Sequence, residues 1–164
     1  MNNLPIKKLV VHCSATRPDH FVDRDIINEW HKKRGFNQIG YHFVILRDGT
    51  IQNGRPPVVM GAHAKGHNKG SLGICLVGGL NQETGRAENN YTPAQMDTLE
   101  KLLDSLEKTH SPEVILGHRD LSPDLNKDGV ITSNEWTKAC PCFDVGTWRS
   151  VTKQRWSWSK VENH

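Results

Sequence analysis

The sequence predicts an α/β fold in which a central mixed β-sheet is flanked by helices, within a single domain spanning residues 1–164. Short apolar runs that predict buried strands are interspersed with amphipathic segments of helical period. The Asp48-Gly49 turn joins two of the strands as a hairpin. No internal repeat, low-complexity tract or linker divides the 164 residues.

Four apolar runs predict the main strands of this sheet. The first carries a His near its end, the second is largely apolar on both faces, the third ends at a Gly pair, and the fourth delivers His118. They are Lys8–Ser14, Tyr41–Arg47, Ser71–Val77 and Glu113–Gly117.

The first helix is expected to begin after Asp23, whose carboxylate is a good N-cap. Behind it Ile26, Ile27 and Trp30 fall on one helical face, and Gly35 is placed to end the helix in a left-handed conformation.

The second helix has the strongest start signal in the chain. Thr92 is an N-cap, Pro93 suits the first helical position, and Gln95 completes a capping box, after which apolar residues repeat at helical spacing. The basic, Trp-rich tail from residue 147 to 164 predicts a packed terminal helix, with contact to an anionic partner as the alternative.

Charge and hydropathy exclude several function classes. The chain has 21 Lys and Arg against 18 Asp and Glu, a net charge of +3, which is too weak to indicate nucleic-acid binding but does not oppose an anionic polymer such as a cell wall. No apolar run approaches the roughly 20 residues that span a bilayer, and Met1–Lys8 lacks the apolar region of a signal peptide. We therefore expect a cytoplasmic protein without membrane insertion. We also expect a monomer.

Nine His and four Cys are the unusual part of the composition. The Cys spacing is not that of a small disulfide scaffold, so reduced thiols are expected. His12 and His118 end apolar strands and Cys140 follows a loop, which together supply the three N and S ligands of a catalytic zinc. Cys142 is an alternative ligand, and each residue alone is also compatible with an ordinary structural role.

Eight motifs occur in an order that resembles the zinc-dependent N-acetylmuramoyl-L-alanine amidases (type 2 amidases) of the phage-lysozyme and peptidoglycan-recognition family. The resemblance covers approximately residues 9–148. The motifs are Val11-His12-Cys13-Ser14-Ala15-Thr16, Gly40-Tyr41-His42-Phe43, Arg47-Asp48-Gly49-Thr50, His63-Ala64-Lys65-Gly66, Ser71-Leu72-Gly73-Ile74-Cys75-Leu76-Val77-Gly78-Gly79, Tyr91-Thr92-Pro93-Ala94-Gln95, Gly117-His118-Arg119-Asp120 and Lys138-Ala139-Cys140-Pro141.

The resemblance implies zinc on His12, His118 and Cys140, and catalytic roles for Tyr41 and Lys138. The reaction it implies is hydrolysis of the amide bond between N-acetylmuramic acid and L-alanine by zinc-activated water. These residue types suit that chemistry, because a lysine ammonium stabilises an oxyanion and a tyrosine hydroxyl orients water or a carbonyl. The general base is not identified, since no Glu follows a zinc-ligating His as in H-E-x-x-H proteases.

The resemblance also implies that His63 and Asn68 contact the substrate, peptidoglycan or a muropeptide. The alternative for both residues is a role in the structure of a Gly-rich surface loop.

The function implied is that of a phage endolysin, which waits in the host cytoplasm and acts on the cell wall after holin-type release. The alternatives are a bacterial wall-recycling amidase and a non-catalytic peptidoglycan-binding module. A calcium-sensing interaction protein would explain residues 124–135 alone.

Residues 124–135 depart from the family pattern and match the twelve-residue loop of an EF-hand. Pro123 precedes this segment and leaves little room for an entering helix, so an EF-hand-like loop is expected rather than a complete EF-hand. Bound calcium is expected to stabilise the protein and to hold Lys138 and Cys140 in place. The calcium ligands would be Asp124, Asn126, Asp128, Val130, Thr132 and Glu135.

Overall fold

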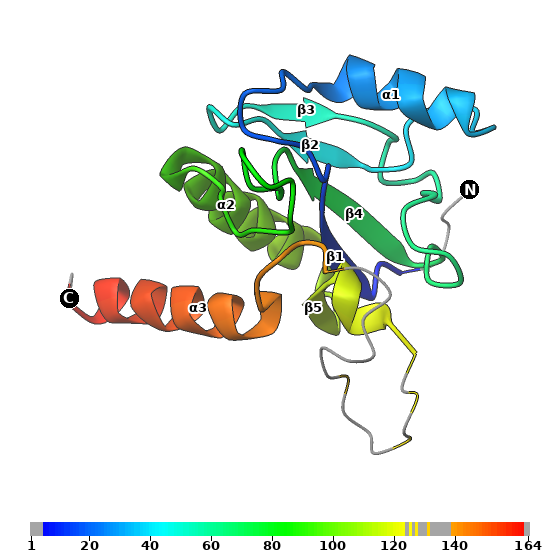
Figure 1. Cartoon of the computed structure of the whole chain (residues 1–164). Coiled ribbons are helices and arrows are strands. Elements are labelled where there is room, and N and C mark those ends of the chain that lie inside the picture. Colours follow the sequence, from blue (N-terminus) through cyan, green and yellow to red (C-terminus); the bar gives the residue numbers. More distant parts are fainter. Residues whose placement is uncertain (1–4, 124, 126, 128–130, 132–138, 163–164) are drawn as a thin grey trace.

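The computed structural model describes residues 5–123, 125, 127, 131 and 139–162, with the backbone alone described for 154–162. In chain order, the strands and helices are β1 (Lys8–Cys13), α1 (Arg24–Lys33), β2 (Phe43–Ile45), β3 (Ile51–Asn53), β4 (Ser71–Leu76), α2 (Pro93–His110), β5 (Val114–Gly117), the short 3-10 helix η1 (His118–Leu121) and α3 (Val145–Glu162). Helices separate β1 from β2 and β4 from β5, whereas β2, β3 and β4 follow one another directly (Figure 1).

The five strands form one mixed sheet in the order β3-β2-β4-β1-β5. The hairpin partners β2 and β3 are antiparallel, whereas β2, β4, β1 and β5 are parallel neighbours. This confirms the predicted fold class. The strand expected over residues 41–47 is shorter than predicted; like β1 it lies second from an edge, and β4 occupies the centre.

Apolar side chains of the sheet divide between two buried clusters, because successive residues of a strand point to opposite faces. Ile45 and Leu9 join the cluster that contains Leu99 and Leu103 of α2. Val44 belongs to the other cluster, which includes Ile27 of α1 (2% exposed), Ile39 and Val77. The helices α1 and α2 therefore cover opposite faces of the sheet.

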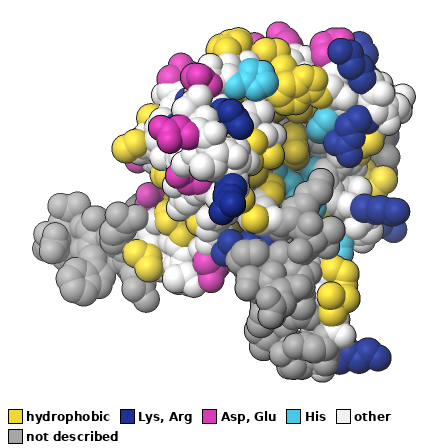
Figure 2. Space-filling model, in the orientation of Figure 1, with side chains coloured by type: hydrophobic (Ala, Val, Ile, Leu, Met, Phe, Trp, Pro, Cys, Tyr) yellow, Lys and Arg dark blue, Asp and Glu magenta, His cyan; other side chains and the backbone are white. Residues whose placement is uncertain are grey.

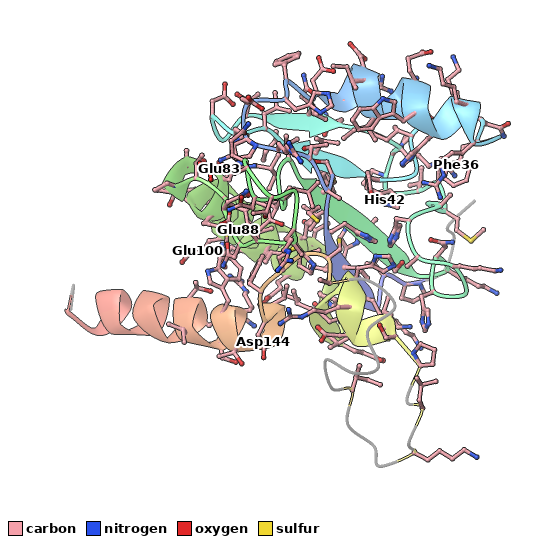
Figure 3. All side chains as sticks on the ribbon, in the orientation of Figure 1. Phe36, His42, Glu83, Glu88, Glu100 and Asp144 are labelled. Carbon is pink, nitrogen blue, oxygen red and sulfur yellow. The ribbon has the colours of Figure 1, made fainter. Side chains whose placement is uncertain are left out.

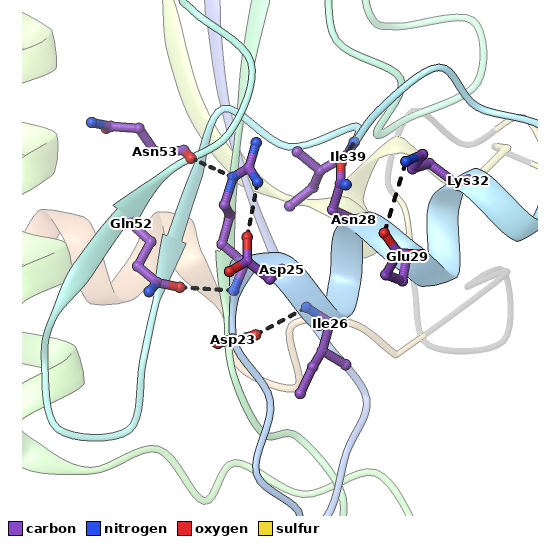
Figure 4. Close-up of polar contacts among 10 residues, drawn as sticks. Asp23, Asp25, Ile26, Asn28, Glu29, Lys32, Ile39, Gln52 and Asn53 are labelled. Carbon is purple, nitrogen blue, oxygen red and sulfur yellow. Dashed lines mark hydrogen bonds and ion pairs between the residues drawn. The ribbon is translucent and has the colours of Figure 1, made fainter.

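Both predicted N-caps are present. The Asp23 carboxylate accepts from the Ile26 N–H at 2.9 Å (Figure 4). Gly35, just beyond the far end of α1, has φ of +96°. The Thr92 hydroxyl accepts from the Gln95 N–H at 3.1 Å, and the Gln95 side chain accepts in return from the Thr92 N–H at 3.0 Å.

Side chains also fix α1 to its surroundings (Figure 4). The Gln52 side-chain oxygen on β3 accepts from the Arg24 N–H at 2.7 Å, and the Asn28 side-chain oxygen accepts from the Ile39 N–H at 2.8 Å. These bonds hold the first turn and the middle of α1 against β3 and against the segment that precedes β2.

The first turns of α3 pack on α2, in agreement with the packed terminal helix predicted for the tail; the side chains from residue 154 on lie outside the described part of the chain. The Arg149 guanidinium, 5% exposed, donates to Asp104 and Glu107 of α2, and Trp148 packs edge-on against Phe143. The basic character of this segment is therefore used internally, at least at Arg149. In the described part of the chain, no helix combines the length and apolar character needed to span a bilayer.

Candidate functional site

A cavity of about 1000 Å³ is lined by residues at the ends of β1 and β5 and by residues that precede β2 and β4. Figure 2 shows a hollow in which histidine and apolar side chains gather, with lysine and arginine side chains along one side. The lining comes from the end of β1, from α1 and the segment after it, from the loop before β4, and from η1 and its continuation. It includes His12, Trp30, His31, Arg34, Phe36, Tyr41, His63, Lys65, Asn68, His118 and Cys140.

His12, His118 and Cys140 meet at this cavity, and their ligand atoms all lie within 4.8 Å of one another. The strand register explains the pairing of the two histidines. Val11 on β1 is paired with Gly117 on the parallel strand β5, so the next residue of each chain segment is a His. Their ring centroids are 4.5 Å apart. Two imidazoles and one thiol match the donor set of a catalytic zinc site, so these residues fit that metal.

Two backbone hydrogen bonds hold Cys140 against this pair. The Cys13 N–H donates to the Cys140 Sγ at 2.9 Å, and the Arg119 N–H donates to the Cys140 carbonyl at 2.8 Å. The following residue approaches β5 so closely that a Cβ on Gly117 would lie 2.8 Å from Pro141 Cδ. The segment is therefore anchored both to β1 and to the end of β5.

All four cysteines are free thiols, as expected. Cys142, the alternative ligand, points elsewhere, because its Sγ donates to the Gly79 carbonyl at 3.5 Å. Contact with the Cys13 thiol is the main cause that raises the pKa of Cys142 far above its ordinary value.

Tyr41 lies between two histidines at the bottom of the cavity. Its ring centroid is 5.1 Å from that of His12 and 5.3 Å from that of His31. Burial, followed by the neighbouring thiols of Cys75 and Cys140, raises the pKa of Tyr41 well above 10. The hydroxyl therefore stays protonated near neutral pH and is able to donate a hydrogen bond.

His63 lies on the loop before β4 and contacts the triad formed by His12, His118 and Cys140. Its Nδ1 is 2.9 Å from His12 Nε2, and its Nε2 is 3.0 Å from the Ser71 Oγ. Burial, with the charges of neighbouring histidines, lowers the pKa of His63 to about 3. The Asn68 side-chain oxygen accepts from the N–H groups of His63 and Ala64 at 2.8 and 2.9 Å, so both residues predicted to bind substrate also organise the loop.

The helix α1 forms one wall of the cavity, and its residues were not predicted from the sequence to lie in the site. Ile27, Trp30, His31 and Arg34 line the cavity, and their i, i+3, i+4, i+7 spacing is the signal that places them on one helical face. Phe36 extends the wall beyond the helix (Figure 3), with the Arg34 guanidinium 5.3 Å from its ring.

His31 has a structural contact of its own in this wall. Its Nδ1 accepts from the Gly40 N–H at 2.8 Å. Burial, followed by the charges of Arg34 and Arg55, lowers the pKa of His31 to about 4. The His31 side chain is therefore neutral near pH 7, and its unprotonated Nδ1 can accept the bond from Gly40.

His42, labelled in Figure 3, lies behind the site. Its Nδ1 accepts from the Gly73 N–H at 3.1 Å, which leaves Nε2 to donate to the Val59 carbonyl at 2.8 Å. This is a structural role, in keeping with the absence of a predicted function for this residue.

Several predicted residues lie outside the described part of the chain. They are the catalytic candidate Lys138 and the calcium ligands Asp124, Asn126, Asp128, Val130, Thr132 and Glu135.

Comparison with known proteins agrees with this geometry. Residues 2–142 match the family model described as N-acetylmuramoyl-L-alanine amidase. The chain is 42% identical over 140 residues to the endolysin of Enterobacteria phage T3 and 41% identical over 140 residues to that of Escherichia phage T7, covering 85% of this chain and 83% of each relative. It also resembles the solved structure of the endolysin amidase LysCS from Clostridium intestinale, with a TM-score of 0.66 and 30% identity over 85% of this chain and 77% of that one. The chain therefore belongs to the N-acetylmuramoyl-L-alanine amidase family and is a peptidoglycan hydrolase of the endolysin type.

Proposed function

We propose that the chain is a zinc-dependent amidase that cleaves the bond between N-acetylmuramic acid and the L-alanine of the stem peptide. The observation that carries the proposal is the convergence of His12, His118 and Cys140 at a cavity of about 1000 Å³. Three protein ligands leave a fourth position for water or substrate, which distinguishes a catalytic zinc from a structural one.

Zinc bound by these three side chains would supply a water of lowered pKa and would polarise the amide carbonyl. The protein contributes hydrogen bonds around that centre. The Tyr41 hydroxyl, which stays protonated, donates to the developing oxyanion, and the Cys13 N–H holds the Cys140 sulfur in place. Lys138, two residues before Cys140, is proposed from the sequence to add an ammonium beside the oxyanion.

The cavity walls suit a muropeptide, which offers apolar methyl groups together with carboxylates. Trp30 and Phe36 provide apolar surface, while Arg34 and Lys65 bring positive charge to the same cavity. Asn68 and His63 are proposed as substrate contacts from the loop wall. Because the Asn68 oxygen is used within the loop, its Nδ2 is the atom proposed to reach the substrate.

We further propose that the protein acts on the wall after holin-type release from the host cytoplasm. The relatives from phages T3 and T7, both named endolysins, support this setting over wall recycling.

The EF-hand-like segment supports a second proposal, that calcium stabilises the protein. The pattern of residues 124–135 is its only support, with oxygen-bearing side chains at positions 1, 3, 5, 9 and 12 and Gly at position 6. Glu135 stands three residues before Lys138, so an ordered loop would restrain the start of the segment that carries Cys140.

Digestion of purified peptidoglycan tests the proposed reaction. The zinc-loaded protein is expected to release new L-alanine amino termini without new reducing sugar ends. His12→Ala is expected to abolish this release, whereas His110→Ala, in the last turn of α2, serves as the matched control and keeps it. New reducing ends would instead identify a glycosidase, and binding without either product would identify a non-catalytic recognition module.

A further inference from the structure

We propose that His63 is a positioning residue of the metal site, which accepts a hydrogen bond from His12 and thereby selects the His12 tautomer that presents Nδ1 to the metal. The inference rests on the zinc proposal made above. It assigns His63 a role toward the metal ligand, in addition to any contact with substrate.

The polarity of the hydrogen bonds begins at Ser71, which is fully buried. Its Oγ lies 2.7 Å from the His67 carbonyl and 3.2 Å from that of Asn68. Carbonyl oxygens only accept, and a hydroxyl has a single proton to give. The Ser71 proton therefore points to the backbone carbonyls, and the 3.0 Å contact with His63 Nε2 is one in which Ser71 accepts.

This polarity determines the tautomer of the first ring. His63 carries its proton on Nε2, so its Nδ1 holds a lone pair and accepts across the 2.9 Å contact with His12 Nε2. The reverse arrangement would leave the Ser71 and His67 oxygens 2.7 Å apart without a proton between them.

The contact with His63 in turn fixes the tautomer of the His12 ring. His12 donates from Nε2, so the lone pair of its neutral ring is on Nδ1. A ring nitrogen binds a metal through its lone pair, and a metal-ligating histidine usually donates its other N–H to an acceptor nearby. The series of hydrogen bonds from the His67 carbonyl through Ser71 to His63 thus leaves His63 Nδ1 as the acceptor for the N–H of His12.

Close packing against two glycines prevents His63 from turning away. A Cβ on Gly73 of β4 would lie 2.5 Å from His63 Cγ, and a Cβ on Gly61 would lie 2.7 Å from His63 Cδ2. The Asn68 oxygen fixes the His63 backbone at 2.8 Å. His63 as a whole is 8% exposed, so protein atoms surround the side chain on nearly all sides.

Zinc affinity is the readout, measured on the full chain by competition with a chromophoric chelator. His63→Ala removes the acceptor and is expected to weaken zinc binding about 10- to 100-fold, the usual effect of losing such a partner. His63→Asn keeps an oxygen near the position of Nδ1 and is expected to restore part of the affinity. Ser71→Ala is expected to weaken binding several-fold, whereas Thr152→Ala, which removes a buried hydroxyl bonded to the Arg149 carbonyl, leaves it unchanged.

Nitrogen NMR of the zinc-loaded wild type checks the tautomer directly and does not depend on the variants folding. We expect a protonated Nε2 and a metal-bound Nδ1 on His12. Zinc bound through His12 Nε2, or equal zinc affinity of His63→Ala and the wild type, would overturn the inference while leaving the amidase proposal intact. A wild type that binds no zinc would instead overturn the proposed function.

Discussion

The backbone N–H of Cys13 donates to the Sγ of Cys140 at 2.9 Å, across 127 residues of sequence. Cys13 follows His12 directly, so the end of β1 supplies both one ligand of the His12, His118 and Cys140 triad and the donor to the sulfur of that triad. A donor aimed at the sulfur orients it toward the histidines. The candidate metal site is therefore built on the end of β1, which pairs with β4 as far as Cys13.

Substitution of the two neighbouring cysteines distinguishes their roles. Cys140→Ser is expected to lose stoichiometric zinc and amidase activity, because the thiolate is the ligand that the triad requires. Cys142→Ser, the matched control, is expected to retain one zinc per chain, since its sulfur contacts the Gly79 carbonyl. Metal analysis of the purified proteins measures the difference, and zinc loss confined to Cys142→Ser would reverse the assignment.

Tyr41→Phe removes the hydroxyl while keeping the ring that packs on His12. We expect kcat to fall about 100-fold, in the range found when one donor to an oxyanion is removed, with zinc affinity unchanged. Tyr91→Phe removes the hydroxyl that donates to the Pro141 carbonyl and is expected to cost about 1 kcal/mol of stability with kcat nearly retained. Full activity of Tyr41→Phe would exclude it as an oxyanion donor.

The pH dependence of stability is expected to include His31. Its pKa is about 4 in the folded protein against 6.5 ordinarily, so below pH 6.5 the unfolded chain binds a proton that the folded protein does not. The stability contribution is complete above pH 6.5 and is lost as the pH falls toward 4, at up to about 1.4 kcal/mol per pH unit.

Urea unfolding between pH 4.5 and 7.5 measures this slope. His31→Asn retains an acceptor for the Gly40 N–H and does not titrate, so its slope is expected to be shallower than that of the wild type. Identical slopes would show that His31 is not a source of the pH dependence. His42 and His63, whose pKa values burial also lowers, act in the same direction and remain in both proteins.

Calcium is expected to raise the melting temperature of the zinc-saturated protein. A ligand at about 100 times its Kd stabilises the state that binds it by about 2.7 kcal/mol. Glu135→Ala is expected to remove this response, and Glu83→Ala, which removes an exposed carboxylate elsewhere, is expected to keep it. Selective chelation of calcium that changed neither the melting temperature nor the rate of wall lysis would rule the proposal out.

The elements of the fold could be predicted where local chemistry decides them. Asp23 and the Thr92–Gln95 capping box determine where two helices begin, because the donors they satisfy are only three residues away. The predicted strand lengths agree less well with the structure. The apolar run over residues 41–47 forms a three-residue β2, since the extent of a strand depends on partners distant in the sequence.

In the site, too, some residues could be predicted from the sequence and others could not. His12, His118 and Cys140 were predicted by resemblance, and the structure brings them together. Ser71 and His31 were not predicted, because their contacts with His63 and Gly40 arise only when loops fold back onto the sheet. Neither the type of these residues nor their spacing to the ligands carries that information.

Zinc dependence of bond cleavage is the decisive test of the proposed metal site. The protein is stripped of metal, divided, and assayed on purified peptidoglycan with and without one equivalent of zinc, by counting new L-alanine amino termini. We predict that release is lost in the stripped sample and restored by zinc in the wild type, and that zinc does not restore it in His12→Ala. Equal release by the stripped and zinc-loaded wild type would contradict the account.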